Sequence, residues 1–282
     1  MSATAAIAEL HYYPVKGARG IALAAATAEV TGLRAHGVGD REWMVVDATG
    51  RFLTQREVPR LALIAPTLER EALVLRADGS GEVGVPLQRA TTESRAVIVW
   101  RSHVRGHDEG EPAARWLSGH LERDVRLVRF DRASRRACNP DFVGSSGAHT
   151  FFSDGYPVLV IGRASLDDLN ARLAAQGHAA LPLNRFRPNV VLEGLPAYEE
   201  DHLEAVHADG ITLRMVKPCT RCQVTTTDQS SAAVGIEPLP TLAAYRHSQR
   251  FGGVCFGMNA IVTDGAGKLL RAGSPAEPAY RF

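Results

Sequence analysis

The chain has 282 residues, 45% of them hydrophobic, and a formal net charge of +1. This length allows one large domain or two closely joined ones. The near-zero net charge gives no long-range attraction for nucleic acid or an anionic membrane. No apolar run reaches the roughly 18 residues of a membrane-spanning helix, and the N-terminal stretch MSATAAIAELHYYPVKG does not resemble a signal peptide. We therefore expect a cytoplasmic protein without nucleic-acid or membrane partners.

The first half of the chain has the pattern of short strands separated by turns. The stretch REWMVVDATGRFLTQ (41–55) predicts a hairpin around an Ala-Thr-Gly turn. LALIAPTL (61–68), ALVLRADGSGEVGVPL (72–87) and RAVIVW (95–100) continue the strand pattern. EPAARWLSGHLER (111–123) is the first segment with apolar residues at helical spacing.

The second half mixes strands with a few helices. Residues 129–147 predict a long connection, followed by a buried strand at YPVLVIG and a helix at RASLDDLNARLAAQG. Ser165 is the expected N-cap of that helix and Gly177 its C-terminal stop. Further strands are predicted at RPNVVLEG, QVTTTD and GMNAIVTD, a hairpin turn at Asp209-Gly210, and a short helix at TLAAYRHSQ. Because strands outnumber helices and do not alternate with them, we expect a mainly β (α+β) barrel fold.

Two of the four cysteines form the motif CTRC, Cys219 to Cys222. The pair is compatible with half of a zinc site, although no second ligand pair follows at suitable spacing. It is also compatible with a thioredoxin-type redox pair, but the β-branched residues after it favour a strand where that motif needs a helix. A third interpretation is a single reactive or metal-binding thiolate favoured by Arg221. A pair of buried thiols without chemistry is the structural alternative.

Several motifs in order resemble one family. YPVKGARGIAL and DREWMVVDATGRFLTQREVPRLALI resemble a MOSC N-terminal β-barrel domain, here 1–120. FSDGYPVLVIGRASLDDLN, NRFRPNVVLEG, VKPCTRCQVTTTD and FGMNAIV resemble a MOSC domain, here 121–282. The chain is similar to the bacterial YcbX-type proteins and to the mitochondrial amidoxime reducing component.

This resemblance implies a molybdenum cofactor bound through its pterin dithiolene and one cysteine thiolate, which matches Cys222. It implies reduction of N-hydroxylated compounds, such as amidoximes, hydroxylamines and N-hydroxylated bases, to amines. The soft thiolate suits such a metal. Asp154 matches a carboxylate close to the metal and is a candidate for proton delivery. The matching cofactor-binding positions are Lys16, Arg41, Arg187, Asn189, Thr220 and Arg221.

Each of these residues also has a plain structural alternative. Lys16, Arg41 and Arg187 could be surface charges, and Asp154 could be a turn residue. Gly17 departs from the family's V-K-S motif, whereas Gly155-Tyr156 follows the bacterial branch.

No cysteine-rich ferredoxin-like segment is present, so we expect electrons from a separate flavin or iron–sulfur reductase. The alternative function is a carrier of molybdenum cofactor or sulfur without reductase activity. A plain β-barrel binding module without a metal is the remaining alternative.

Overall fold

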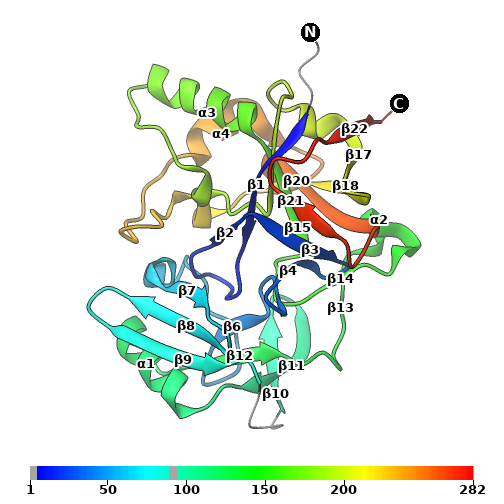
Figure 1. The fold of residues 1–282 in the computed structure, drawn as a ribbon. Coiled ribbons are helices and arrows are strands. Elements are labelled where there is room, and N and C mark those ends of the chain that lie inside the picture. The colour runs from blue at the N-terminus through cyan, green and yellow to red at the C-terminus, as the bar shows by residue number, and fades with distance from the viewer. Residues whose placement is uncertain (1–4, 89–93, 282) are drawn as a thin grey trace.

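The computed structural model describes residues 5–88 and 94–281, in which strands predominate and four α-helices occur. Figure 1 shows two lobes, with residues 43–88 and 94–130 forming the lower one and the described segments before and after them forming most of the upper one. The mainly β fold expected from the sequence is confirmed. The division of the chain at 120/121 stays a prediction. Strands from before this boundary pair with strands from after it, so the first and last parts of the chain build the upper lobe together.

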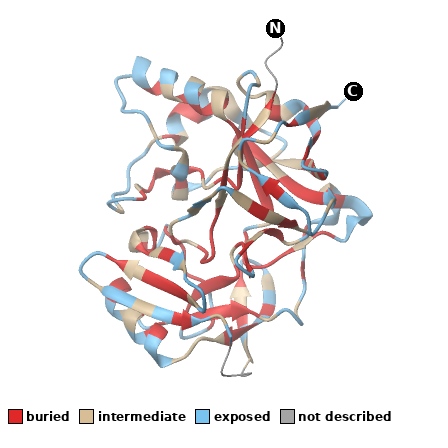
Figure 2. Ribbon diagram, in the orientation of Figure 1, coloured by how far each residue is buried: buried red, intermediate tan, exposed pale blue. Residues whose placement is uncertain are grey.

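The upper lobe contains two sheets around one apolar core. The larger sheet runs in the order β2 (Ile21–Leu23), β1 (Ala6–Tyr12), β16 (Val190–Glu193), β15 (Val158–Gly162), β20 (Gly253–Asp264), β18 (Ile211–Thr220), β17 (Leu203–Ala208) and β22 (Glu277–Tyr280), and β19 (His247–Ser248) pairs with β20. The smaller sheet runs in the order β21 (Leu269–Arg271), β3 (Ala25–Glu29), β4 (Gly32–Ala35) and β5 (Val38–Gly39). Side chains of both sheets share one buried cluster, as the central red strands in Figure 2 illustrate.

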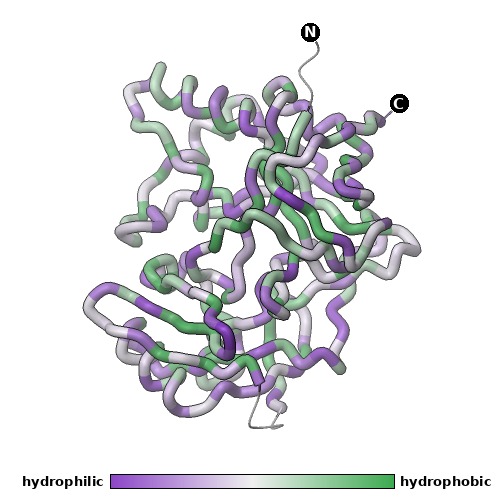
Figure 3. The backbone as a smooth tube through the Cα atoms, viewed as in Figure 1, coloured by the Kyte–Doolittle hydropathy of each residue, from purple (hydrophilic) through white to green (hydrophobic). Residues whose placement is uncertain are grey.

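The continuous apolar run of β15 follows from burial on both faces. Val158 and Val160 point into the core between the two sheets. Leu159 and Ile161 point the other way and pack under α3 (Arg163–Ala175) and α4 (Leu239–Arg246). Such strands lack the alternation of half-exposed ones, and several stretches of tube in the middle of the upper lobe are green in Figure 3. Because β15 and β16 are parallel, they need a crossover connection, which contains α3.

The lower lobe is built from hairpins and one helix. Its four-stranded sheet runs in the order β10 (Ser94–Val99), β11 (Ser102–Asp108), β12 (Val125–Phe130) and β6 (Trp43–Asp47). A three-stranded sheet contains β7 (Ala65–Leu68), β8 (Ala72–Ala77) and β9 (Gly81–Pro86), and α1 (Glu111–Leu121) packs against this lobe. The connection predicted at 129–147 holds only the short elements β13 (Arg136–Ala137), α2 (Pro140–Val143) and a 3-10 turn at Gly144–Ser146, and β13 pairs with β14 (His149–Thr150).

Most predicted elements are confirmed, and three differ for local reasons. The turn of the predicted 41–55 hairpin is present, but its two arms are joined by an isolated bridge between Val46 and Phe52 instead of a ladder of paired residues. The strand expected at 61–68 begins at Ala65, because Pro59 opens a 3-10 helix at Pro59–Leu63. The strand expected at QVTTTD is wrong: Gln223–Thr226 is a 3-10 turn, η5. The hydroxyls of Thr225 and Thr226 donate to carbonyls three residues earlier, which favours the turn over a strand.

The predicted N-cap at Ser165 is also wrong, because α3 begins at Arg163. Ser165 is fully buried, donates to the Glu200 carboxylate at 2.7 Å and accepts the Tyr198 backbone N–H at 2.7 Å. The same carboxylate accepts the Gly162 N–H at 3.0 Å. Burial raises the pKa of Glu200, and these hydrogen bonds oppose that rise. Gly177, with a φ of 79°, follows the end of the helix as predicted.

We expect Ser165→Ala to lower the free energy of unfolding by about 1–3 kcal/mol, because it leaves buried polar groups of Glu200 and Tyr198 without their partner. Denaturant unfolding of the variant measures this change. Ser145→Ala is the control, since Ser145 is exposed and its loss should change stability by less than about 0.5 kcal/mol. Equal effects of the two substitutions would contradict the role assigned to the buried hydroxyl.

Candidate active site

All eight residues selected from the sequence line one pocket between the two lobes. These residues are Lys16, Arg41, Asp154, Arg187, Asn189, Thr220, Arg221 and Cys222, and Cys219 and Gly17 lie in the same wall. Among the described residues, six cationic side chains line the pocket, against a single carboxylate, Asp154; the cations are Lys16, Arg41, Arg56, Arg185, Arg187 and Arg221. A chain with almost no net charge therefore concentrates positive charge at one place, which suits an anionic ligand.

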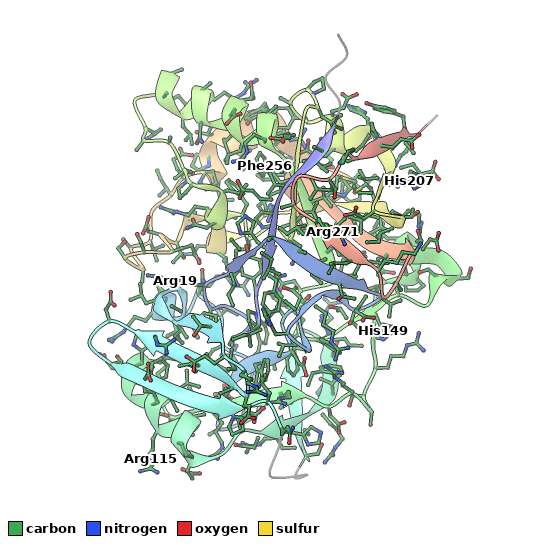
Figure 4. The ribbon with its side chains drawn as sticks, in the orientation of Figure 1. Arg19, Arg115, His149, His207, Phe256 and Arg271 are labelled. Carbon is green, nitrogen blue, oxygen red and sulfur yellow. The ribbon has the colours of Figure 1, made fainter. Side chains whose placement is uncertain are left out.

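Strand pairing brings these distant segments together. β1 pairs antiparallel with β16, with Leu10 opposite Val190, so the loop after β1 lies beside the segment before β16. The end of β18 pairs with β20, with Thr220 opposite Cys255, which fixes the CTRC segment next to Phe256. Phe256, labelled in Figure 4, lies inside the upper lobe. Strand register therefore brings the loop after β1, the segment before β16 and the CTRC segment to the same pocket.

Lys16 and Asp154 form an ion pair across the pocket. The Lys16 ammonium donates to Asp154 Oδ1 at 2.5 Å and to the Phe152 carbonyl at 2.8 Å. Lys16 is buried, whereas the Asp154 side chain is 74% exposed toward the pocket. The indole N–H of Trp100 donates to the same carboxylate oxygen at 3.0 Å. Asp154 is therefore an acceptor of two hydrogen bonds rather than an isolated acid.

The pKa directions of this pair follow from its surroundings. Displacement of water by neighbouring atoms would raise the pKa of Asp154, but the Lys16 ammonium and the Trp100 N–H hold that pKa well below its ordinary value. Burial lowers the pKa of Lys16, and the Asp154 carboxylate opposes this effect. At neutral pH the carboxylate is ionised, so the transferable proton of the pair is on Lys16 Nζ.

Arg41 is held in place by groups behind the pocket. Its guanidinium donates to the fully buried Asp40 carboxylate and, at 3.1 Å, to Asn189 Oδ1. The Asn189 oxygen also accepts the Leu159 N–H at 3.1 Å, and its amide nitrogen donates to the His11 carbonyl at 3.2 Å. Asn189 is thus in the wall as predicted, but its side chain is occupied in orienting Arg41. Its contact with a cofactor stays a prediction.

Arg187 and Arg221 each keep one buried guanidinium nitrogen without a partner among the described residues. Arg187 donates to the Ala18 carbonyl at 2.7 Å, and Arg221 to the Phe256 and Phe186 carbonyls at 2.8 and 3.0 Å. Nη2 of both side chains is buried and makes no hydrogen bond within residues 5–88 and 94–281. Burial lowers the pKa of Arg187 to about 10, so it stays charged at neutral pH. Buried donors of this kind fit a phosphate or another anionic group.

The two cysteines of CTRC have different environments. Cys219 lies at the end of β18 and packs beside an apolar cluster, and burial raises the pKa of its thiol. Cys222 is exposed in the pocket wall and precedes η5. Both thiols lie in the pocket wall, but Cys222 is the more exposed of the two, and burial favours the neutral thiol form of Cys219.

The remaining interpretations of the cysteine pair lack support. Within the described part of the chain, no group of three or more His, Cys, Asp or Glu side chains could hold a metal ion, so a zinc site built from protein ligands alone is not formed. The motif also does not open an α-helix, unlike a thioredoxin-type pair.

Several site residues were not singled out from the sequence. Arg185 and Gln55 line the pocket, and Gln55 donates to the Gly17 carbonyl at 2.6 Å. Gly17 itself has a φ of 86°, a conformation that favours glycine over the serine usual in the family motif. Trp100 comes from a hairpin turn of the other lobe, and only its apolar strand context was visible in the sequence.

Three arginines of the 129–147 connection do not line the pocket. Arg132 pairs with Glu42, and Arg135 donates to the Gly147 carbonyl. Arg136 is buried and donates to the carbonyls of Phe151, Ser153 and Asp154. It therefore fixes the loop that carries Asp154.

No helix of the described residues has the length and apolarity needed to cross a membrane.

Comparison with known families matches residues 4–124 to the MOSC N-terminal beta barrel domain and residues 148–277 to the MOSC domain. The chain is 33% identical to mitochondrial amidoxime reducing component 2 of Bos taurus, over 85% of this chain and 72% of that protein. It is 35% identical to mitochondrial amidoxime-reducing component 1 of Mus musculus (85% and 71%) and 34% identical to that of Homo sapiens (85% and 72%).

The unpartnered donors predict that the ligand-free protein binds anions such as pyrophosphate. We expect pyrophosphate to raise the Tm of the wild type, because a ligand that binds only the folded state stabilises it. Arg221→Met should remove most of this rise, since it deletes a charged donor of the pocket. The control Arg115→Met, on the exposed face of α1 at the lower edge of Figure 4, should retain the rise. Differential scanning calorimetry with and without pyrophosphate measures each shift, and an unchanged rise in Arg221→Met would contradict the assignment.

Proposed function

Since the chain belongs to the family of MOSC-domain proteins that includes the mitochondrial amidoxime reducing components, we propose that it is a molybdenum-cofactor-dependent reductase of N-hydroxylated compounds. The observation that carries this proposal is the meeting of an accessible thiol, Cys222, with unpartnered buried guanidinium groups in one pocket. We include in the proposal a cytoplasmic location and a separate flavin or iron–sulfur protein as electron donor.

The residues present fit such a cofactor. The free donors of Arg187 and Arg221 suit its anionic phosphate end, and Arg185 extends the same cationic wall. Cys222 offers the soft sulfur ligand that molybdenum takes, and Arg221 lies beside it in the pocket wall. Thr220, exposed at the end of β18, lies beside these groups. When bound, the cofactor supplies the two-electron chemistry that separates the nitrogen–oxygen bond.

The protein's own contribution includes proton supply. Reduction of an N-hydroxyl group to an amine and water takes up two electrons and two protons. Lys16 Nζ holds a proton at the pocket and is bonded to Asp154, which is ionised. We therefore assign the first donor role to the Lys16 ammonium, with Asp154 holding it charged and in place. This assignment differs from the expectation from the family resemblance, in which Asp154 delivers the proton and Lys16 binds the cofactor.

Cys222→Ala should lose both bound molybdenum and reductase activity, because it removes the proposed metal ligand. Cys219→Ala is the matched control and should keep both, since that thiol packs beside an apolar cluster. The measurement is molybdenum and pterin content per chain in protein from a cofactor-producing host, followed by turnover of a benzamidoxime with a reductase added. Loss of molybdenum in Cys219→Ala alone would show that the ligand is misassigned. Bound cofactor without any turnover would favour the carrier function.

The pH dependence of kcat/KM tests the proton donor. Activity should fall on the alkaline side as Lys16 loses its proton. In Asp154→Asn the carboxylate that raises the pKa of Lys16 is absent, so this alkaline limb should move to lower pH. Asp124→Asn, an exposed carboxylate in the lower lobe, is the control and should leave the profile unchanged. An unmoved alkaline limb in Asp154→Asn would exclude Lys16 as the titrating donor.

A further inference from the structure

Trp100 occupies an unusual place for a large aromatic residue. It stands with Arg101 in the two-residue turn between β10 and β11, where Val99 pairs with Ser102. Its backbone has a φ of 55°, and the residue is 41% exposed. Turns of this kind favour glycine, asparagine or aspartate, and a bulky side chain is disfavoured there. The unfavourable backbone and the exposed ring indicate that the side chain serves a purpose other than folding the hairpin.

The ring is held in a defined position by neighbours on two elements. Its centroid lies 5.0 Å from that of Phe52, at an interplanar angle of 56°. The Arg56 guanidinium carbon lies 4.9 Å from the indole ring, within cation–π range. The indole N–H donates to Asp154 Oδ1 at 3.0 Å, on the opposite lobe. These contacts fix the ring at the junction of the lobes without covering it completely.

Trp100 also lines two adjoining pockets. It lines the site pocket together with Phe52, Thr54 and Arg56, and the same four residues line an adjoining surface groove. That groove continues over Arg101 and Ile98. The ring therefore lies in the wall that the proposed reaction site shares with this groove, where part of a substrate larger than its N-hydroxyl group would lie.

We propose that Trp100 is a specificity-determining residue whose ring forms the wall on which flat, conjugated N-hydroxylated substrates stack. Its N–H has a second, positioning role, because it holds the Asp154 carboxylate that accepts from Lys16. Stacking is a contact that a planar amidoxime can make and a small aliphatic hydroxylamine cannot, so the ring favours the former. This inference rests on the proposed reductase function.

The two roles can be separated by two substitutions in the cofactor-loaded protein. Trp100→Leu removes the aromatic face, and Trp100→Phe keeps an aromatic face but removes the N–H. Trp116→Phe is the matched control, since Trp116 lies on α1 and donates to the Ser80 carbonyl in the lower lobe. Benzamidoxime and N-methylhydroxylamine serve as the planar and aliphatic substrates. Binding of benzamidoxime is also measured by calorimetry in the absence of an electron donor.

We expect Trp100→Leu to raise the Kd and KM for benzamidoxime by about 3- to 10-fold, as loss of an aromatic contact implies, and to leave the KM for N-methylhydroxylamine within about twofold. Trp100→Phe should retain the benzamidoxime KM and lower kcat for both substrates, because Asp154 loses a donor. Trp116→Phe should match the wild type in every measurement.

An equal rise in KM for both substrates in Trp100→Leu, or an unchanged benzamidoxime Kd, would overturn the stacking wall. An unchanged kcat in Trp100→Phe would overturn the positioning role. If the wild type with bound molybdenum reduces neither substrate, the proposed function fails, whereas the calorimetric comparison of wild type with Trp100→Leu still decides whether the ring binds the planar compound.

Discussion

The ion pair between Lys16 and Asp154 is the contact on which the site depends. It joins the loop after β1 to the loop before β15. The indole N–H of Trp100, in the lower lobe, donates to the same carboxylate oxygen and so connects that lobe to the pair. Three segments remote in sequence therefore meet at one atom. Because Lys16 is buried, losing Asp154 would leave its charge with the Phe152 carbonyl and the Phe52 and Trp100 rings as neighbours, and without a carboxylate partner. The position of the lobes relative to each other and the charge state of the site are thus coupled.

Behind this pair, the protein holds several cations close together without matching each with a carboxylate. The guanidinium carbons of Arg41 and Arg187 lie 4.2 and 4.3 Å from the ring centroid of Tyr13. Backbone carbonyls take up much of the hydrogen bonding of Arg187 and Arg221. Carbonyls orient the guanidinium groups but do not cancel their charge, so the pocket stays positive in a nearly neutral chain. A bound anion would complete this arrangement, which is why the fold is suited to an anionic cofactor.

The two lobes contribute different things to the proposed reaction. The upper lobe supplies the thiol, Cys222, and the guanidinium donors, all set by strand register in the barrel. The lower lobe supplies Phe52, Arg56 and Trp100, which face the site from a turn and from irregular chain. Turn residues can change without disturbing a barrel core, so the proposed substrate preference can vary while the proposed cofactor-binding wall is kept.

The sequence by itself determined the mainly β architecture, most of its strands and helices, and the residue types of the candidate site. Periodicity and turn chemistry are local, so the 209–210 hairpin turn, α1 and α4 were predictable. Prediction from the sequence failed where other contacts override the expected local structure. Ser165 is not an N-cap but donates to the Glu200 carboxylate. The hydroxyls of Thr225 and Thr226 in η5 donate to nearby backbone carbonyls, and these residues do not form the predicted strand.

Only the tertiary structure decided which groups face each other. That Asp154 is paired with Lys16, that Arg187 and Arg221 keep free donors, and that Trp100 closes the site from the other lobe all depend on contacts across more than thirty residues of sequence, which no local pattern encodes.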